Sequence, residues 1–466
     1  MTRLSDNLNA EANMKYNLLL KKNMLDDFSI DAGWMPLKSY TNLLTDKDKF
    51  KYGTLNYKNG LMTLDLFQGW PLKHGAITFG TKLRRINNIF GCVADSNIYY
   101  IFIPNIAKSD TLHFPFAITK QSWNLIQFSI TDYLPDEKVT LNNLILDYDM
   151  LDRWIAPAQK FVVKDDMSLS IVSSDNIFLS KFTFEGRVFN VFLVEDISER
   201  SKNENRNVIY TNKAYLLIKG ENNISTSDAI YFATEFRKIL SVILAWPVNT
   251  TQLSKRGIKG DKATQVSEDV YFLETRSPKE MPELSAFYTF QFNTDINFNK
   301  IVSNWFNASS ELKILIQDYL LTVSYTMSMQ NMLINLTQGI EAFYRKEKVI
   351  FYRRGKKLKK DECLLNKIKK MLCTFSDEFI NKVEKDIGMN IKKWAELIKN
   401  TRVFIVHGNK KGEIIENTTD LWHSVQLLQY LVQVFILQEL GMIDLSEQKE
   451  FNQIVDCKIK LNTLEK

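Results

Sequence analysis

Two side chains near the end of the sequence have the chemistry that phosphodiester cleavage requires. Arg402 and His407 are separated by four residues, and Gly408 follows directly. Arginine offers a planar, permanently charged group that fits phosphate oxygens, and histidine exchanges protons near neutral pH. Neither role needs a metal ion, so we expect no metal site and no cofactor. Both residues also complement a helix C-terminus by charge alone, so their spacing leaves a purely structural interpretation open.

The surrounding pattern predicts a helix that ends at Gly408. Trp394, Ile398 and Ile405 recur at helical spacing before that glycine. Side chains five residues apart on an ideal helix point about 140° apart. The site therefore needs either a distorted last turn or a second copy of the chain across a two-fold axis. The apolar run Val403–Val406 favours burial on nearly all sides, by a bundle interior together with a dimer interface.

A strongly basic segment lies upstream of this helix. Residues 345–370 contain twelve basic and three acidic side chains, a local net charge of +9, whereas the whole chain carries +6. Gly355 indicates a turn, so the segment is either a hairpin or an extended loop. Such a cluster attracts a polyanion, although a solvated loop is the alternative interpretation. We expect RNA contacts from six of its residues: Arg353, Arg354, Lys356, Lys357, Lys359 and Lys360.

The elements that must position these residues change type along the chain. Short β-branched and aromatic runs fill the region from about residue 33 to residue 218, with turn signals at Asn59-Gly60 and Glu185-Gly186. Ile98–Pro104 is a further predicted strand. No helical pattern alternates with these runs, so we expect an antiparallel sandwich-like or jelly-roll domain and not a doubly wound sheet.

Helical periodicity appears later. Ser227 is the predicted cap of a helix that Pro247 stops, and the polar segment 249–265 is predicted to be a long loop. From about Asn299 the pattern is helical almost to the end. We therefore expect an α+β protein with a β-rich domain at 1–295 and an all-α bundle at 296–466.

The composition excludes several protein classes. The 466 residues are 45% hydrophobic with nine prolines, which rules out collagen and wholesale disorder. The four cysteines are too widely spread for a disulfide framework or a zinc site. No stretch approaches the roughly 18 apolar residues of a membrane span, and the first residues lack an apolar signal core. We expect a cytoplasmic protein without membrane contact.

These motifs together resemble one family. The Arg402-x4-His407-Gly408 motif, preceded by the run Gln338–Arg345 (QGIEAFYR), resembles the HEPN superfamily and specifically its ApeA type. The first 290 or so residues, with GWMPL at 33–37, YGTLNY at 52–57 and a helical segment at 225–246, resemble the β-rich N-terminal domain of ApeA anti-phage proteins. The resemblance covers nearly the whole chain.

The resemblance implies a metal-independent endoribonuclease of bacterial defence, acting by abortive infection as a homodimer through its HEPN domain. His407 would deprotonate the RNA 2′-hydroxyl or protonate the leaving 5′-oxygen, Arg402 would stabilise the pentavalent phosphorane, and a 2′,3′-cyclic phosphate would result. Glu341 would orient Arg402. Its alternative role is structural, as a helix-surface glutamate that pairs with Arg345 one helical turn away. The substrate would be RNA, with tRNA one candidate, and a phage-derived trigger would dock on the N-terminal domain.

One departure from the family pattern keeps a second hypothesis open. HEPN motifs commonly have Asn, Asp or His directly after the arginine, and this chain has Val403. The alternative is a catalytically silent HEPN module that dimerises and binds RNA or a protein.

Overall fold

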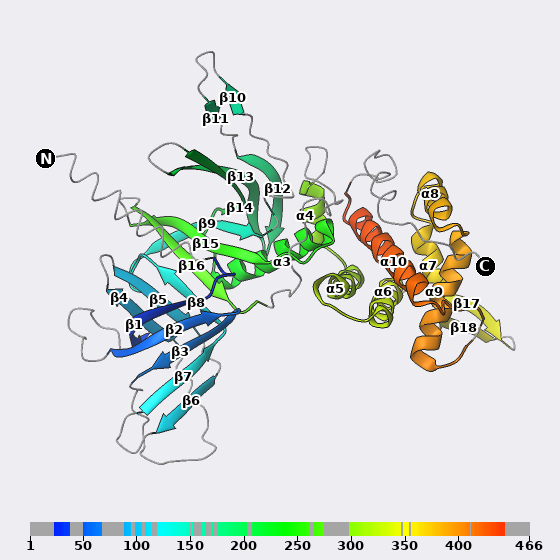
Figure 1. Cartoon of the computed structure of the whole chain (residues 1–466), viewed down its shortest axis with the longest axis horizontal. Coiled ribbons are helices and arrows are strands. Elements are labelled where there is room, and N and C mark those ends of the chain that lie inside the picture. Colours follow the sequence, from blue (N-terminus) through cyan, green and yellow to red (C-terminus); the bar gives the residue numbers. More distant parts are fainter. Residues whose placement is uncertain are drawn as a thin grey trace.

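The structure is a computed structural model with a large β-sheet followed by a helical bundle (Figure 1). It describes residues 23–37, 50–67, 88–94, 98–104, 108–113, 119–149, 151, 161–163, 169–171, 176–202, 207–260, 264–274, 298–345, 348–353, 356–410 and 412–442. The fold is α+β, as the sequence predicts. The predicted domain boundary at residue 295 lies outside the described residues.

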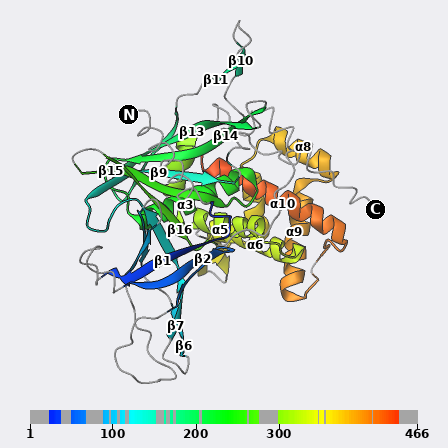
Figure 2. The ribbon, with the colours of Figure 1, turned by 60° about the vertical axis from the view of Figure 1, so that its left-hand side comes forward.

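Fourteen of the described strands form one antiparallel sheet. Its edge strands β7 (Thr119–Leu125) and β6 (Lys108–His113) lie at the bottom of the view in Figure 2, and a separate hairpin of β10 (Phe161–Val163) and β11 (Leu169–Ile171) lies at the top. In sheet order the strands are β12 (Ile177–Phe184), β13 (Arg187–Lys202), β14 (Asn207–Gly220), β9 (Val139–Tyr148), β15 (Thr250–Lys259), β16 (Thr264–Phe272), β8 (Gln127–Thr131), β5 (Ile98–Pro104), β4 (Asn88–Ala94), β1 (Phe28–Pro36), β2 (Lys51–Lys58), β3 (Leu61–Leu66), β7 (Thr119–Leu125) and β6 (Lys108–His113).

Both predicted two-residue hairpins are confirmed. Asn59 and Gly60 have φ values of 50° and 75° between β2 and β3, and Glu185 and Gly186 have 48° and 75° between β12 and β13. Positive φ at both central positions is the geometry whose twist matches that of the flanking strands. The predicted strand Ile98–Pro104 is also confirmed as β5.

The sheet curves over on itself, which gives it a sandwich-like interior. Phe28 of β1 and Tyr57 of β2 are in ring contact with Phe128 of β8 and Tyr271 of β16, with ring centroids 5.3 to 6.4 Å apart. β5 and β4 lie between these two pairs of strands in the sheet order. Since neighbouring strands are about 4.8 Å apart, a flat sheet would keep these rings well separated.

One long helix, α3 (Thr226–Leu244), packs against the sheet. Its N-cap is Ser225, whose Oγ accepts a hydrogen bond from Asp228 N at 3.1 Å, so the helix begins two residues earlier than the predicted cap Ser227. The helix ends at Ala245 in the left-handed conformation, before Pro247. Its buried face includes Phe232 and Phe236, which contact Phe182 of β12.

The prediction that 249–265 is a long loop is wrong: this segment contains all of β15 and the first two residues of β16. These strands pair with each other and, through β9 and β8, with the rest of the sheet. Their inward positions include Lys255 and Glu268, which form a buried ion pair. A charged pair in the interior breaks the alternation of apolar and polar residues by which a strand is recognised.

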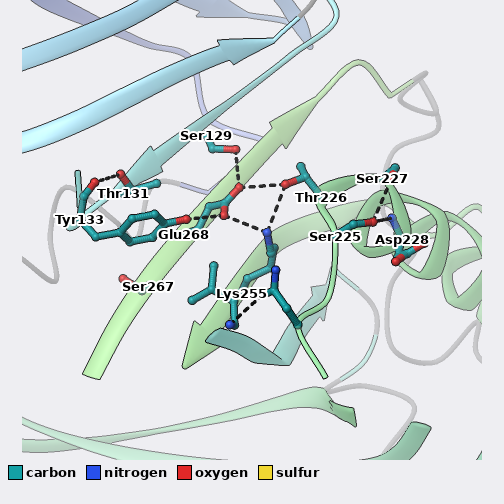
Figure 3. Close-up of polar contacts among 12 residues, drawn as sticks. Ser129, Thr131, Tyr133, Ser225, Thr226, Ser227, Asp228, Lys255, Ser267 and Glu268 are labelled. Carbon is teal, nitrogen blue, oxygen red and sulfur yellow. Dashed lines mark hydrogen bonds and ion pairs between the residues drawn. The ribbon is translucent and has the colours of Figure 1, made fainter. Parts of the chain in front are cut away.

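That ion pair belongs to a closed network at the start of α3 (Figure 3). Glu268 Oε1 accepts hydrogen bonds from Ser129 Oγ (2.8 Å) and Thr226 Oγ1 (3.0 Å). Glu268 Oε2 accepts from Tyr133 OH (2.7 Å) and Lys255 Nζ (2.8 Å). Burial alone raises the pKa of Glu268, but the charge and bond of Lys255 and the bonds from Tyr133 and Ser129 bring that pKa below its usual value. The network fixes α3 to strands β8, β15 and β16.

Seven further helices follow the sheet. They are α4 (Phe298–Phe306), α5 (Ser310–Ser324), α6 (Met329–Phe343), α7 (Leu364–Leu372), α8 (Asp377–Ile387), α9 (Ile391–His407) and α10 (Thr418–Glu439) among the described residues. A two-stranded hairpin, β17 (Lys348–Arg353) and β18 (Lys356–Asp361), separates α6 from α7. The helix α10 is buried along most of its length and contacts α3, α5 and α6.

The two parts share one continuous hydrophobic core. The Phe306 ring of α4 stacks on Phe182 of β12 at 4.4 Å, and Asn299 Oδ1 accepts a bond from Lys181 N at 2.9 Å. Gln433 of α10 donates to the carbonyl oxygens of Val242 (2.8 Å) and Ile243 (3.1 Å) at the end of α3. The helical part is therefore joined firmly to α3 and the nearby sheet edge.

Candidate functional site

Arg402 is held by an ion pair between two helices. Its Nη2 lies 2.9 Å from Oε2 of Glu341, which is in the last turn of α6, 61 positions earlier in the chain. The Arg402 side chain is 20% exposed and that of Glu341 is 34% exposed. Among the ion pairs of the described residues, Glu341 pairs with Arg402 and not with Arg345. The arginine is thus fixed at one nitrogen and still reached by solvent.

The Arg402 guanidinium is incompletely satisfied. It has five N–H donors in total. The described residues supply the one hydrogen bond to Glu341, and the Nε atom is buried without any acceptor. The Nε donor is closed to solvent, so the Nη groups of this 20%-exposed side chain are the donors that a phosphate could reach. This arrangement can direct donors at a phosphate.

A third helix, α7, supports the end of α6 through Lys367. From the sequence, this residue counted only as part of the charge of the basic segment. Lys367 of α7 is buried, and its Nζ donates to the backbone oxygen of Glu341 at 3.0 Å. The signal was available in the helix pattern, because Lys367 lies on the apolar side of α7 between Leu364 and Met371. Lys367 fixes the end of α6, and with it the carboxylate that contacts Arg402.

His407 is the last residue of α9 and is exposed. Gly408 has φ 70°, and its N–H donates to Phe404 O at 2.8 Å, so the predicted helix-ending glycine is confirmed. Because that bond has regular α-helical spacing, the distorted last turn is wrong. Within one chain, Arg402 and His407 therefore remain on different sides of the helix.

The apolar run beside the motif is partly exposed in the single chain: Phe404 is 39% exposed and Val406 is 43% exposed. The predicted burial on nearly all sides combined the bundle interior with a dimer interface, so it stays a prediction for the dimer. The bundle covers only the opposite face of α9, where Trp394 and Ile398 are fully buried. Both exposed apolar residues precede His407, within three positions of it in the sequence.

The chain after the motif returns across α9. Asn400 Nδ2 donates to Glu413 O at 3.0 Å, and Ile415 N donates to Thr401 Oγ1 at 3.0 Å. Asn400 and Thr401 are both buried. These two buried polar residues therefore support the turn between α9 and α10.

The basic segment contains a hairpin, one of its two predicted forms. In β17 and β18, Arg353 pairs with Lys356, Tyr352 with Lys357, Ile350 with Lys359 and Val349 with Lys360. Arg354 lies outside the described residues. The hairpin follows the helix that carries Glu341 and precedes the helix that carries Lys367, at the end of the molecule far from the sheet (Figure 1).

Among the described residues, no cluster of three or more His, Cys, Asp or Glu side chains has an arrangement that could hold a metal ion. None of the helices described has the length and apolar character needed to cross a membrane.

Comparison with known proteins identifies the helical part. Residues 334–444 match the family of Apea-like HEPN domains, a range that contains Glu341, the basic hairpin, Arg402 and His407. No curated protein and no solved structure matches the chain significantly. HEPN domains are typically ribonucleases that bind RNA and dimerise. Residues 334–444 therefore form an Apea-like HEPN domain, which supports the resemblance to ApeA-type HEPN proteins.

Proposed function

We propose that this protein is a metal-independent endoribonuclease of bacterial anti-phage defence. The observation that carries the proposal is the ion pair between Arg402 and Glu341, which brings together the two separate motifs of the HEPN domain at 2.9 Å. The match over residues 334–444 supports the same interpretation. The cell would stop growing when its RNA is cut, an abortive response in the cytoplasm.

The proposed chemistry uses the chain's own side chains. His407 removes the proton of the RNA 2′-hydroxyl or protonates the leaving 5′-oxygen, and Arg402 stabilises the charge on the phosphorane. Attack of the 2′-oxygen on phosphorus breaks the bond to the 5′-oxygen and leaves a 2′,3′-cyclic phosphate. Glu341 is a positioning residue, because its carboxylate fixes one edge of the Arg402 guanidinium.

The working site requires two protomers in this proposal. Since α9 is regular through His407, one chain cannot bring both side chains to one phosphate from the same face. A two-fold axis near the exposed Phe404 and Val406 would bring the two motifs together and bury this apolar surface. We propose that the homodimer forms through the HEPN domain at this surface.

The basic hairpin is the proposed RNA contact. The segment between α6 and α7 concentrates positive charge in Arg353, Arg354, Lys356, Lys357, Lys359 and Lys360. Backbone contacts of this kind bind RNA without reading its sequence, so the identity of the RNA, with tRNA as one candidate, is set elsewhere. A phage-derived trigger would act on the β-rich part.

Cleavage of labelled RNA in EDTA tests the proposal directly. Wild type should release products with 2′,3′-cyclic phosphate ends, and His407→Ala and Arg402→Ala should each cut about 10²–10⁴-fold more slowly. His423→Ala, a histidine on α10 whose ring lies 4.9 Å from that of Trp422, is the matched control and should retain activity. Equal rates in all four proteins would overturn the proposal.

Mixing the two inactive variants tests the two-protomer site. Dimers of Arg402→Ala with His407→Ala contain one intact arginine and one intact histidine, so partial activity should return after subunit exchange. A site within one chain predicts no recovery.

The alternative is a silent HEPN module that binds RNA or a protein. Val403 favours it, because this position commonly carries a polar residue in HEPN motifs. It predicts that charge reversal in the hairpin abolishes growth arrest in infected cells while His407→Ala has no effect.

A further inference from the structure

A cavity of about 520 Å³ lies between α3 and the first helices of the bundle. One wall is a row on α3 at helical spacing, Tyr231, Glu235, Lys238 and Ser241, and the facing wall is the side of α5 from Lys313 to Ser324. Trp305 of α4 and the segment 247–249 close the ends. The volume is within the usual range for small-molecule sites, and it lies where the two parts of the molecule meet.

The lining is net positive. Arg237, Lys238 and Lys313 face one acidic residue, Glu235. Glu235 is already engaged, because its carboxylate accepts bonds from Lys238 Nζ (2.6 Å) and Trp305 Nε1 (2.8 Å). Lys313 is exposed on α5 and has no ion-pair partner among the described residues. The cavity therefore retains a cation for an anionic ligand.

Arg237 is a second cation, held from behind. Its Nη1 lies 3.1 Å from Oε1 of the buried Glu274, which also accepts bonds from the backbone and hydroxyl of Thr250. Burial raises the pKa of Glu274 despite the charge of Arg237. The pair fixes the guanidinium on the wall of the cavity.

Two aromatic rings complete the lining. Tyr231 of α3 is 39% exposed and Tyr325, directly after α5, is 41% exposed. The Tyr231 ring is held in place by stacking on Phe184 at 4.9 Å. Exposed aromatic rings beside cations match a ligand that combines a flat ring with a negative group, because rings stack on bases and cations contact phosphate.

We propose that this cavity binds a nucleotide, with the base against the tyrosines and the phosphate at Lys313 and Arg237. The ligand would contact α3 and α5 at once. It would thereby strengthen the junction that Gln433 of α10 already makes with the end of α3. The nucleotide is either free or the phosphorylated end of an RNA, since both present the same chemistry. The site is separate from Arg402 and His407 and does not depend on their activity.

Calorimetry on the full chain tests this site. We use ATP and AMP as free nucleotides, a 5′-phosphorylated RNA tetramer as the RNA end, and adenosine and pyrophosphate as half-ligands. His407→Ala is the background throughout, so that RNA is not cut. Saturable binding of one ligand per chain by a nucleotide or by the tetramer, together with a higher Tm, is the expected result. The arm whose binding is weakened by the cavity variants below identifies the source, because RNA held by the basic hairpin would keep its affinity in those variants.

Variants then locate the ligand. Lys313→Glu and Tyr325→Ala should each weaken binding by about tenfold, since a charge-assisted contact or a stacked ring contributes on that order. Both residues are exposed, so both variants should fold; Arg237 is avoided because its loss would leave Glu274 buried and unpaired. Lys392→Glu, an exposed lysine on α9 outside the cavity, is the matched control and should bind as before. Absence of binding, binding of pyrophosphate alone, or equal affinity in Lys313→Glu would overturn the proposal.

Discussion

The sheet part and the helical part each contain an ion pair that joins separate elements, and the two pairs differ in how completely they are satisfied. Lys255 and Glu268 are 2.8 Å apart with side chains 5% and 8% exposed, and each oxygen of Glu268 accepts two hydrogen bonds. Arg402 and Glu341 are 2.9 Å apart, 20% and 34% exposed, and the arginine retains a buried donor without an acceptor. The pair of Lys255 and Glu268 therefore leaves no carboxylate oxygen for a ligand, whereas Arg402 still has donors without acceptors among the described residues.

This difference separates a structural pair from a functional one. A charge that is fully paired in the interior stabilises the folded state. When it is removed, its former partner stays buried without a counter-charge, and the free energy of unfolding falls. A partly exposed pair such as Arg402 and Glu341 contributes little to the free energy of unfolding, because solvent screens it. Substitutions in the two pairs should therefore affect different measurements.

The largest expected effect is on stability, from Lys255→Met. Removal of the cation leaves the Glu268 carboxylate buried beside an apolar chain, and the free energy of unfolding should fall by about 3–5 kcal/mol. Urea unfolding measures this loss. Lys259→Met is the control on the same strand, because its pair with Glu137 is more exposed and should be worth less than about 1 kcal/mol. Equal losses in both variants would remove the distinction between the pairs.

The next effect is a pH dependence that arises beside the sheet pair. Burial raises the pKa of Asp269 to about 7, despite a hydrogen bond from Ser254, and its Oδ2 has no partner among the described residues. The folded carboxyl keeps its proton up to that pH, whereas an unfolded aspartate releases it near 3.8. The folded state then binds more protons between these values, so the free energy of unfolding falls as pH rises from about 4 to 7.

Asp269→Asn should remove this slope, which amounts to about 3–4 kcal/mol across the interval, since each unit of pKa difference is about 1.4 kcal/mol. Urea unfolding at several pH values provides the measurement, with the exposed Asp136→Asn as control. A slope that persists in Asp269→Asn would assign it to another group.

Local signals in the sequence predicted local structure well. Asn59-Gly60 and Glu185-Gly186 each determine a hairpin through their own backbone preferences, so distant residues are not needed. β15 was missed for the opposite reason. Its inward Lys255 is acceptable only because Glu268 lies opposite on β16, and that pairing is a property of the folded sheet.

The candidate site shows the same limit. Helical periodicity predicted that the helix ends at Gly408, but the contact between Glu341 and Arg402 joins residues 61 positions apart and was expected only from the family resemblance. Lys367 was counted only as part of the basic segment, although its side chain is buried. The sequence predicted that the bundle and a dimer interface together cover Val403–Val406, but four consecutive apolar residues do not show which side chains each would cover; in the single chain Phe404 and Val406 are exposed.

The helical pair should respond in catalysis and not in stability. Glu341→Gln removes the charge that orients Arg402, so kcat for RNA cleavage should fall about 10–100-fold with KM nearly unchanged. The free energy of unfolding should change by less than about 1 kcal/mol. Glu341→Asp should recover part of kcat, and Glu378→Gln on the exposed face of α8 is the control. A large loss of stability would instead make this pair structural, like that of Lys255 and Glu268.

The smallest effect is expected from single charges in the hairpin. Lys357→Ala should weaken RNA binding only a few-fold and reduce the slope of log affinity against log salt by about 0.7, the value for one phosphate contact on a single strand. Titration of labelled RNA into His407→Ala protein at several salt concentrations measures the slope, and Lys392→Ala on α9 is the control. Because a phosphate contact weakens every sequence alike, the loss should be the same for unrelated RNAs. A loss confined to one RNA would mean that the hairpin reads bases, and an unchanged slope would mean that Lys357 makes no phosphate contact and the hairpin charge is only solvated.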